Sequence, residues 1–153
     1  GCHADDIKET TKAVKVLLEE EAHRGMQTLV PYSDFQPRAD KIKNDLLEFL
    51  LKQKKAGKSV AAYGAAAKGN TLLNYAGVKA DLLPFVCDAA VSKQDKFMPG
   101  SHIPIMSPQM MLEVKPDYVL ILPWNIAEEV KSQLSQKLRN TQFVAMVPEL
   151  TVQ

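Results

Sequence analysis

The sequence predicts an α/β fold with a doubly wound, mostly parallel sheet of about five strands, preceded by an N-terminal helical segment. Three observations support this prediction. After residue 57, short apolar runs typical of buried strands alternate with helical patterns. A turn rich in glycine and alanine follows the first run, and before residue 58 the apolar residues recur at helical spacing. We therefore expect a helical connector over residues 1–57 and one compact domain over residues 58–153.

Two helices are expected in the N-terminal segment. The first spans residues 4–24, begins with the acidic pair Asp5 and Asp6, and has a thin apolar stripe. That stripe consists of Ile7, Val14, Leu17 and Leu18. A polar and aromatic loop over residues 28–37 leads to the second helix, residues 37–55. Its apolar stripe consists of Ile42, Leu46, Phe49 and Leu50.

The compact domain has a regular order of strands and helices. Its expected strands are residues 59–63, 83–88, 103–106, 117–122 and 143–147, and its expected helices are residues 68–75, 107–114 and 125–139. Ser107 and Asn125 have the side chains of helix N-caps. A polar loop is expected over residues 92–101. Strands that alternate with helices at this spacing imply right-handed crossovers and a parallel sheet covered on both faces.

Composition narrows the classes of function. The net charge is +1, and neither the first 58 residues nor the rest is strongly basic, which disfavours nucleic-acid binding. No apolar run approaches the roughly 18 residues that a membrane helix needs, and no signal peptide opens the chain. The cysteines and histidines offer neither a disulfide framework nor a metal site. We expect a cytoplasmic protein, and Gly1 in place of Met suggests a cut or tagged piece of a longer one.

The central feature is the turn over residues 64–71, which joins the first strand to a helix. In a doubly wound sheet, the free N–H groups of such a helix start point to a phosphate at the carboxyl edge of the strands. The small Gly64, Ala65 and Gly69 let a ligand approach the backbone. Lys68 lies in the first helical turn, where its charge opposes the helix dipole, and an anion would compensate for this. The alternative is that the turn only permits tight packing and that Lys68 is solvated.

Two nucleotide-binding motifs nearly fit this turn, and both fail. A P-loop needs a lysine at position 70, where the chain has Asn70. A dinucleotide motif needs two more glycines, where the chain has alanines. Asp88 nevertheless closes the second expected strand, where a dinucleotide domain has its ribose-binding acid. Asn70 and Thr71 either donate to the same ligand or cap the helix.

Two later loops should meet the same edge of the sheet. Lys93 and Lys96 follow the second strand and His102 follows them, so their side chains could reach the ligand. An ordinary exposed loop is the alternative. Trp124 and Asn125 follow the fourth strand. Trp124 either stacks on a base or packs at the core or a domain interface, and Asn125 either caps a helix or binds substrate.

The residues point to binding and not to catalysis. The histidines form no Ser–His–Asp or Cys–His pattern, and no pair of acids lies in an apolar setting. Cys87 belongs to an apolar strand, where a thiol serves as inert packing. We therefore expect a binding module with no catalytic residue, cofactor or metal of its own.

Several blocks of the sequence together resemble the C-terminal domain of bacterial sugar C-methyltransferases. The blocks lie in the family's order between about residue 38 and residue 149. They are residues 63–75 (YGAAAKGNTLLNY), 93–94 (KQ), 99–105 (PGSHIPI), 116–120 (PDYVL), 123–125 (PWN) and 147–149 (VPE). Any one block is a weak signal, whereas their combination is specific.

The resemblance implies a function for the parent protein. Members of this family have an N-terminal zinc-binding region, a middle S-adenosylmethionine (SAM) domain and a Rossmann-like C-terminal domain. They methylate a carbon of a nucleotide-linked 4-keto-deoxysugar, commonly on dTDP. A base removes a proton beside the ketone, and the resulting enolate takes the methyl group. The C-terminal domain helps to hold the sugar nucleotide against the middle domain, so the SAM-binding domain of the parent protein is an implied partner.

The chain departs from the complete family pattern. It has no cysteine quartet for zinc and no acidic glycine-rich SAM loop, so we expect the isolated chain to bind a nucleotide sugar without methylating it. The expected substrate site comprises Gly64, Ala65, Lys68, Gly69, Asn70, Thr71, Asp88, Lys93, Lys96, His102, Trp124 and Asn125. Two alternatives stay open. One is a dinucleotide-binding domain of an NAD-dependent oxidoreductase, with Asp88 on a ribose hydroxyl; the other is a structural domain that docks a partner through Trp124 and the N-terminal helices.

Overall fold

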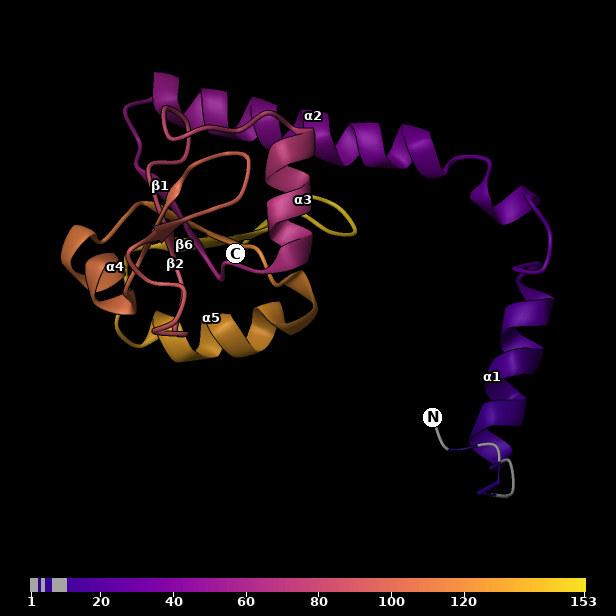
Figure 1. Ribbon diagram of the computed structural model, residues 1–153. Coiled ribbons are helices and arrows are strands. Elements are labelled where there is room, and N and C mark those ends of the chain that lie inside the picture. The colour runs from indigo at the N-terminus through magenta and orange to yellow at the C-terminus, as the bar shows by residue number, and fades with distance from the viewer. Residues whose placement is uncertain (1–2, 4, 7–10) are drawn as a thin grey trace. The chain divides into compact units, whose positions relative to one another are not determined.

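The computed structural model describes residue 3, residues 5–6 and residues 11–153. The chain divides into two compact units, Gly1–Ala39 and Asp40–Gln153. The second unit contains the sheet and the helices that cover it (Figure 1). In the described part of the chain, no helix is both long and apolar enough to cross a membrane.

The first unit contains helix α1 (Lys12–His23) and the 3-10 helix η1 (Val30–Tyr32). The first helix was predicted to begin at the acidic pair Asp5 and Asp6. This part of the prediction was wrong, because both residues lie in a turn ahead of α1. Residues 4 and 7–10, with Ile7 of the predicted stripe, lie outside the described residues. The rest of that stripe is exposed, at Val14, Leu17 and Leu18.

A seven-stranded sheet forms the centre of the second unit, in the order β3-β4-β2-β1-β5-β6-β7. The strands are β1 (Val60–Tyr63), β2 (Val86–Cys87), β3 (Lys96–Phe97), β4 (Pro104–Met106), β5 (Tyr118–Ile121), β6 (Gln142–Ala145) and β7 (Thr151–Val152). The inner strands run parallel, and β3 and β7 pair antiparallel at the edges. The predicted α/β fold with a mostly parallel sheet is confirmed. The two edge strands, β3 and β7, were not predicted, because a run of two residues is too short to show a strand pattern.

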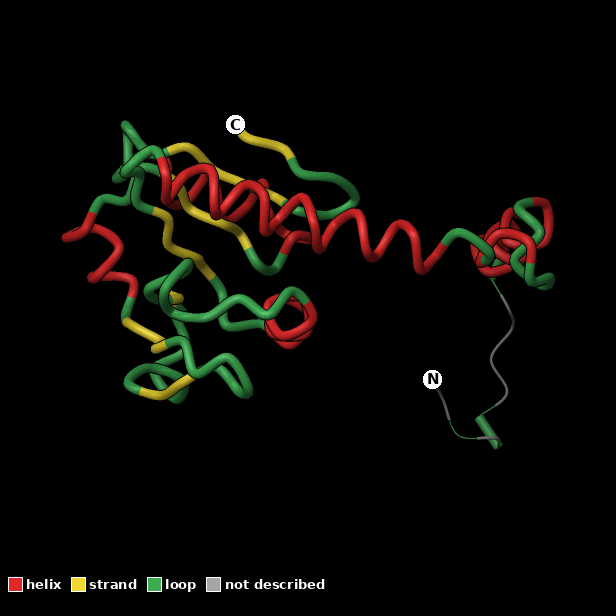
Figure 2. Tube along the Cα trace, turned by 90° about the horizontal axis from the view of Figure 1, so that it is seen from above, coloured by secondary structure: helices red, strands yellow, loops and turns green. Residues whose placement is uncertain are grey.

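The parallel strands are arranged outward from β1 in two directions. β2 and then β4 lie on one side, and β5 and then β6 lie on the other, which is the order of a doubly wound, Rossmann-like sheet. Helices α2 (Phe35–Lys55) and α3 (Ala67–Tyr75) cover one face, as Figure 2 shows for the part of α2 over the strands. Helices α4 (Pro108–Val114) and α5 (Ala127–Ser135) cover the other. The order of the strands reverses between β1 and β5, which is where sheets of this kind commonly bind ligands.

The core forms on both faces of the sheet because strand side chains alternate in direction. In β1, Val60 and Ala62 pack under α2 and α3, whereas Ala61 packs under α4 and α5. Leu46 of α2 is fully buried in the first cluster, and Met111 of α4 is fully buried in the second. The second half of α2 therefore packs in the compact unit, which begins at Asp40. The connector role of residues 1–57 stays a prediction.

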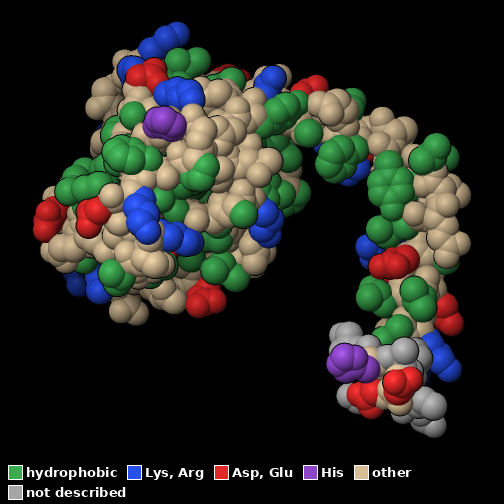
Figure 3. All heavy atoms as spheres, in the orientation of Figure 1, with side chains coloured by type: hydrophobic (Ala, Val, Ile, Leu, Met, Phe, Trp, Pro, Cys, Tyr) green, Lys and Arg blue, Asp and Glu red, His purple; other side chains and the backbone are tan. Residues whose placement is uncertain are grey.

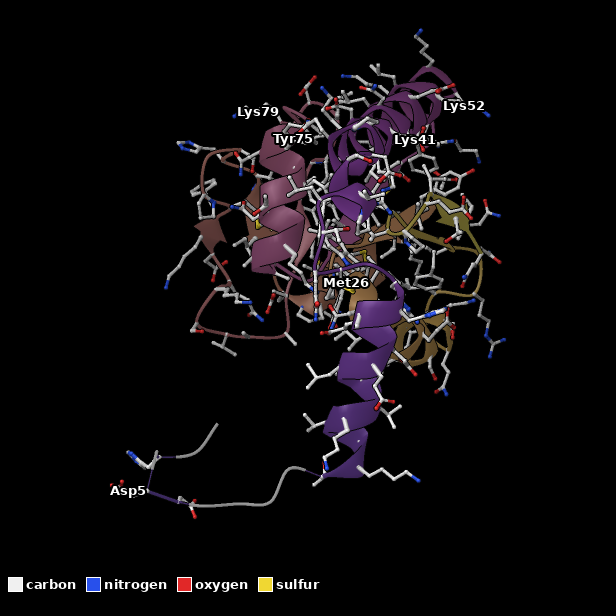
Figure 4. The ribbon with its side chains drawn as sticks, turned by 90° about the vertical axis from the view of Figure 1, so that its right-hand side faces the viewer. Asp5, Met26, Lys41, Lys52, Tyr75 and Lys79 are labelled. Carbon is white, nitrogen blue, oxygen red and sulfur yellow. The ribbon has the colours of Figure 1, made fainter. Side chains whose placement is uncertain are left out.

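Tyr75 holds the end of α3 against α2. Its hydroxyl donates to the carboxylate of Asp40, and the ammonium of Lys43 lies 5.2 Å from the centre of its ring. Figure 4 shows Tyr75 on α3 beside the helix that carries Lys41 and Lys52. This contact orients α3, whose other end reaches the carboxyl edge of the sheet.

Several helix boundaries differ from the sequence prediction. Asn125 is not an N-cap, because it lies inside a 3-10 helix, η2 (Trp124–Ile126), and α5 follows Ile126. A hydrogen bond from the Ile126 N–H to the carbonyl of Pro123 closes this tighter turn. Ser107 precedes α4 as predicted, but its side chain makes no capping hydrogen bond. The polar loop expected over residues 92–101 contains β3.

Asp117 ties the start of β5 to the start of β1. Its carboxylate accepts hydrogen bonds from Lys58 Nζ at 2.9 Å, from the Ser59 N–H at 2.8 Å and from Ser59 Oγ at 2.8 Å. The hydrogen bond from Lys58, followed by those from Ser59, holds the pKa of Asp117 well below its usual range. The carboxylate is therefore a source of stability that depends on pH.

Asp117→Asn is expected to reduce the loss of stability in acid. A carboxyl whose pKa is lowered by folding stabilises the fold above its unfolded-state pKa of about 3.9, and that contribution disappears as the pH falls toward the folded-state pKa. Urea unfolding from neutral pH down to about pH 2.5 should show a steeper loss for the wild type than for the variant. Asp81→Asn is the matched control, since the Asp81 carboxylate lies 3.7 Å from Lys54 in an exposed pair. Equal slopes for the wild type and Asp117→Asn would contradict this prediction.

Candidate functional site

The turn between β1 and α3 is pressed against the end of β5. Gly64 has a φ of +89°, and a Cβ added there would lie 2.5 Å from Cδ of Pro123. A Cβ added to Gly69 would lie 2.5 Å from Cβ of Leu122. The Gly64 N–H donates to the carbonyl of Cys87 at 2.7 Å. Tight packing, the alternative that the sequence left open, is therefore sufficient to explain both glycines.

Asp88 joins this turn to the loop that follows β2. Its side chain is 11% exposed, and its carboxylate accepts the N–H of Ala65 at 2.7 Å and the N–H of Ala90 at 2.8 Å. Lys93 Nζ lies 3.1 Å from the same carboxylate and donates to the carbonyl of Ala65 at 3.0 Å. Gln94 donates to the backbone carbonyl of Asp88 at 2.9 Å. Both carboxylate oxygens of Asp88 are thus already engaged by donors of the protein.

A cavity of about 570 Å³ opens beside this network. Its lining comes from the start of α3, from the loop after β2 and from the hairpin of β3 and β4. Most of the wall is apolar: Ala65, Ala66, Ala67, Phe97, Met98, Pro99 and Ile105. The polar lining residues are Asn70, Ser92, Lys93 and Lys96. An apolar wall with a few polar groups is typical of small-molecule sites, and the volume falls in their usual range.

Asn70 lines the cavity, although its Oδ1 is buried within the protein. Its Oδ1 has no hydrogen-bond partner among the described residues. Its backbone carbonyl accepts from Nδ2 of Asn74 at 2.9 Å, and the same amide donates to the carbonyl of Pro99 at 2.9 Å, which ties α3 to the opposite wall. Thr71 bonds within its own helix, because its Oγ1 donates to the carbonyl of Ala67 at 3.1 Å. Neither residue caps α3, whose N-cap is Ala66 without a side-chain hydrogen bond.

Lys68 belongs to a second group, which lies beyond the ends of β1 and β5 with Trp124 and Asn125. Its ammonium donates to Oδ1 of Asn125 at 2.9 Å and lies 5.3 Å from the centre of the Trp124 ring. Trp124 is half-buried and packs against the core, whereas Lys68 and Asn125 are exposed. Lys68 does not line the cavity. Two groups of predicted site residues thus flank the first turn of α3, one at the cavity (Ala65, Asn70, Lys93 and Lys96) and one at Lys68, Trp124 and Asn125.

Lys96 and His102 were both predicted to reach the ligand, but they lie in different places. Lys96 lines the cavity, and its ammonium donates to the backbone carbonyl of Ser92 at 2.6 Å and to no described carboxylate. His102 is exposed, has a φ of +57° and does not line the cavity. Its N–H donates to the carbonyl of Met98 at 3.0 Å, so it closes the turn before β4.

The arrangement is suited to binding. Burial raises the pKa of the Cys87 thiol to about 11, so the thiol is neutral at physiological pH. Among the described residues, no three His, Cys, Asp or Glu side chains are grouped to hold a metal ion. Figure 3 shows Lys and Arg side chains scattered among acidic and hydrophobic ones on the face that it draws, unlike a continuous basic surface for nucleic acid.

Of the apolar cavity wall, sequence reasoning singled out Ala65 but not the residues that face it from the loop after β2 and from β4. Phe97, Met98 and Pro99 follow one another in the loop that was expected to be polar. The run of three large or stiff apolar residues in that loop is the signal that could have identified the wall. Pairing of β3 with β4 then turns this run toward α3.

Comparison with known proteins agrees with the resemblance noted in the sequence. The model of a family described as the C-methyltransferase C-terminal domain matches residues 1–148. A protein named C-methyltransferase NovU, from Streptomyces niveus, is 36% identical over 142 residues, which cover 92% of this chain and 34% of that protein. The chain therefore spans about a third of the length of the curated relative that it matches.

Proposed function

This chain belongs to the family of C-methyltransferase C-terminal domains, and from that premise we propose that it holds the substrate of a SAM-dependent C-methyltransferase. The proposed substrate is a nucleotide-linked keto-deoxysugar of the dTDP type. In the parent enzyme, SAM supplies the methyl group, and the base that removes the proton beside the ketone lies outside this chain. The name of the matching relative supports the reaction class.

The observation that carries the proposal is the cavity at the carboxyl edge of the sheet. A nucleotide has a flat, largely apolar base and a charged diphosphate, and the cavity offers an apolar wall together with Lys96, whose charge no described carboxylate balances. The first-turn N–H groups of α3 have no partner within the helix, so Ala67 and Lys68 present further donors to a diphosphate. The sugar would then extend toward Trp124 and Asn125.

Two contacts disfavour a dinucleotide or SAM at the turn after β1. Pro123 and Leu122 fill the space beside Gly64 and Gly69, where a cofactor would need to approach the backbone. Asp88 accepts protein donors at both oxygens, so a ribose hydroxyl would have to displace one of them. The NAD-dependent oxidoreductase is therefore the less favoured alternative.

The partner in this proposal is the SAM-binding domain of the parent protein, with residues 1–57 as the connector. The exposed apolar residues of the first unit support the proposal, because Leu17 and Leu18 of α1 are 55% and 56% exposed and Phe35 is 65% exposed. Exposed apolar residues in such number are typical of surfaces that another protein covers.

Calorimetric titration of the chain with dTDP, NAD and SAM tests the proposal. We expect heat from dTDP, and none from NAD or SAM. Binding of NAD in place of dTDP would favour the oxidoreductase. Failure of the 153-residue chain to bind dTDP would refute its role as the nucleotide-binding domain.

Lys68→Ala is expected to weaken dTDP binding. The loss of one charge-assisted hydrogen bond costs about 1.5–3 kcal/mol, which is roughly a 10- to 150-fold change in Kd. Lys43→Ala is the matched control, because Lys43 also lies over an aromatic ring, that of Tyr75, but on α2. Calorimetry of both variants should show a weaker Kd for Lys68→Ala alone. An unchanged Kd would favour a role of Lys68, Trp124 and Asn125 in docking.

A further inference from the structure

A second pocket, of about 320 Å³, opens at the amino edge of the sheet, whereas the cavity beside α3 lies at the carboxyl edge. Its walls come from the loop that joins α4 to β5 and from the loop that joins α5 to β6. The lining residues are Lys115, Lys137, Leu138, Arg139, Asn140 and Thr141. Three of the six are cationic, and the only apolar one, Leu138, is 3% exposed. The lining therefore suits a small anion and offers no surface to an apolar ring.

The cations of this pocket are not balanced by the protein. Across the described residues, no carboxylate lies at ion-pairing distance from Lys115, Lys137 or Arg139, and their charged groups make no hydrogen bond. Elsewhere at the same edge, Lys58 has the carboxylate of Asp117 at 2.9 Å. Like charges that share a pocket repel each other, so a bound anion would stabilise this arrangement.

The pocket is held in shape by the backbone around it. Oγ1 of Thr141 donates to the carbonyl of Pro116 at 2.7 Å, and the N–H of Gln142 donates to the carbonyl of Asp117 at 2.9 Å. These hydrogen bonds join the two loops that carry the cations. A site that is already ordered loses little free energy to ordering when a ligand binds.

Stabilisation of helix ends is the structural alternative for these cations. A positive charge is favourable at the carboxyl end of a helix, within its last turn. This explains Lys115, which directly follows α4, although its φ of +47° is one that glycine adopts at lower cost. It does not explain Arg139, which lies more than a helical turn of sequence beyond Ser135, the last residue of α5.

Arg139 indicates the kind of anion. A guanidinium group has a planar fork of N–H donors that matches two oxygens of one phosphate group, whereas an ammonium acts as a point charge. Arg139 and Lys137 lie on one loop and Lys115 on the other. A ligand with two linked phosphate groups can therefore reach the cations of both loops at once.

We propose that the pocket at the amino edge binds a compact anion with linked phosphate groups, such as pyrophosphate. Arg139 holds one phosphate group through two N–H donors, and Lys115 and Lys137 neutralise the remaining charge. Free pyrophosphate and the diphosphate of a larger ligand share this chemistry, and the test below distinguishes them. The proposal does not rest on the proposed function, because it concerns the other edge of the sheet.

The test is a titration of the 153-residue chain, followed by two-dimensional NMR of its backbone N–H groups, with pyrophosphate, sulfate and dTDP at constant ionic strength. We expect pyrophosphate to shift the signals of residues 115 and 137–141. At these signals its Kd should be at least about tenfold lower than that of sulfate, which cannot reach both loops. The Kd of dTDP there should be no lower than that of pyrophosphate, because the pocket has no wall for a base.

Three variants assign the binding to the pocket. Arg139→Ala and Lys115→Gly should each raise the Kd for pyrophosphate at least about tenfold. Lys115→Gly also removes the unfavourable positive φ, so its Tm should equal or exceed that of the wild type. Lys52→Ala is the matched control, since Lys52 is an exposed cation in the last turn of α2 that does not line the pocket, and it should leave the Kd unchanged.

Several results would overturn the proposal. The first is a titration in which pyrophosphate shifts no signal, or only the signals of residues 65–70 and 92–99 around the other cavity. The second is an equal Kd for sulfate and pyrophosphate, or an equal rise of the Kd in Lys52→Ala and Arg139→Ala, either of which would indicate an unspecific cationic surface. The third is tighter binding of dTDP than of pyrophosphate at residues 115 and 137–141. The proposed function would stand in each case, because its test concerns the carboxyl edge.

Discussion

Gly64→Ala should lower the free energy of unfolding by about 2–4 kcal/mol, one of the two largest losses that we expect from a single substitution in this chain. Two effects add at this position. A φ of +89° is unfavourable for any residue with a Cβ, and that Cβ would lie 2.5 Å from Cδ of Pro123. A proline ring is bonded to its own backbone, so it cannot rotate away. Relief requires a shift of β5's end or of the turn itself.

Gly77→Ala is the matched control for this prediction. Gly77 also has a positive φ, +68°, but a Cβ added there meets nothing within 4 Å. We expect it to lose only about 1–2 kcal/mol, the cost of the left-handed conformation by itself. Urea unfolding of both variants gives the difference, which measures the contact with Pro123. Equal losses in the two variants would show that the turn yields easily to Pro123.

Gly64→Ala should also displace residues of the candidate site. Pro123 leads directly into Trp124 and Asn125, which contact Lys68. A displaced Pro123 would separate these groups. We therefore expect the Kd for dTDP to rise in Gly64→Ala and not in Gly77→Ala, when both are measured at a temperature where each is folded.

Asp88→Ala is the second substitution with a large expected effect, a loss of about 2–4 kcal/mol in the free energy of unfolding. The carboxylate of Asp88 accepts the N–H groups of Ala65 and Ala90, which are partly buried, and each would be left without its charged acceptor. Lys93 would lose its partner as well, but its side chain is 44% exposed, so that pair contributes little. Most of the loss therefore comes from the two backbone donors.

Two further variants place limits on this interpretation. Asp81→Ala removes the carboxylate of an exposed ion pair, whose side chains are 54% and 67% exposed, and should cost less than about 1 kcal/mol. Asp88→Asn keeps one acceptor oxygen and should fall between the wild type and Asp88→Ala. Urea unfolding measures all three. A loss in Asp88→Ala no larger than that in Asp81→Ala would mean that water replaces the carboxylate at the turn.

Asp88→Ala should also weaken nucleotide binding. Ala65 and Lys93 both line the cavity and are both held by Asp88. Without Asp88, these residues are free to leave their positions, and a site loses affinity when its groups must be ordered on binding. We expect the Kd for dTDP to rise with the loss of stability in Asp88→Ala.

The centre of the fold could be predicted from the sequence. Strand β1, the turn at Gly64, helix α3 and strand β5 were all predicted close to their observed positions. Each has a local cause, either an apolar run of strand length or a turn of small residues, and local patterns are visible without knowledge of the fold. The residues of the cavity at Ala65, Lys93 and Lys96 could be predicted for a related reason. In a parallel sheet, loops that follow strands meet at the carboxyl edge.

The contacts of those side chains, in contrast, became visible in the folded structure alone. Lys68 lies over Trp124, and its partner Asn125 is 57 positions away in the chain. Asp88 contacts the N–H of Ala65, a residue 23 positions away. Asn70 Oδ1 is buried and has no partner among the described residues, which the sequence around it does not reveal. Such contacts depend on how elements that are distant in sequence pack together. No local pattern of residues shows which of these elements will meet.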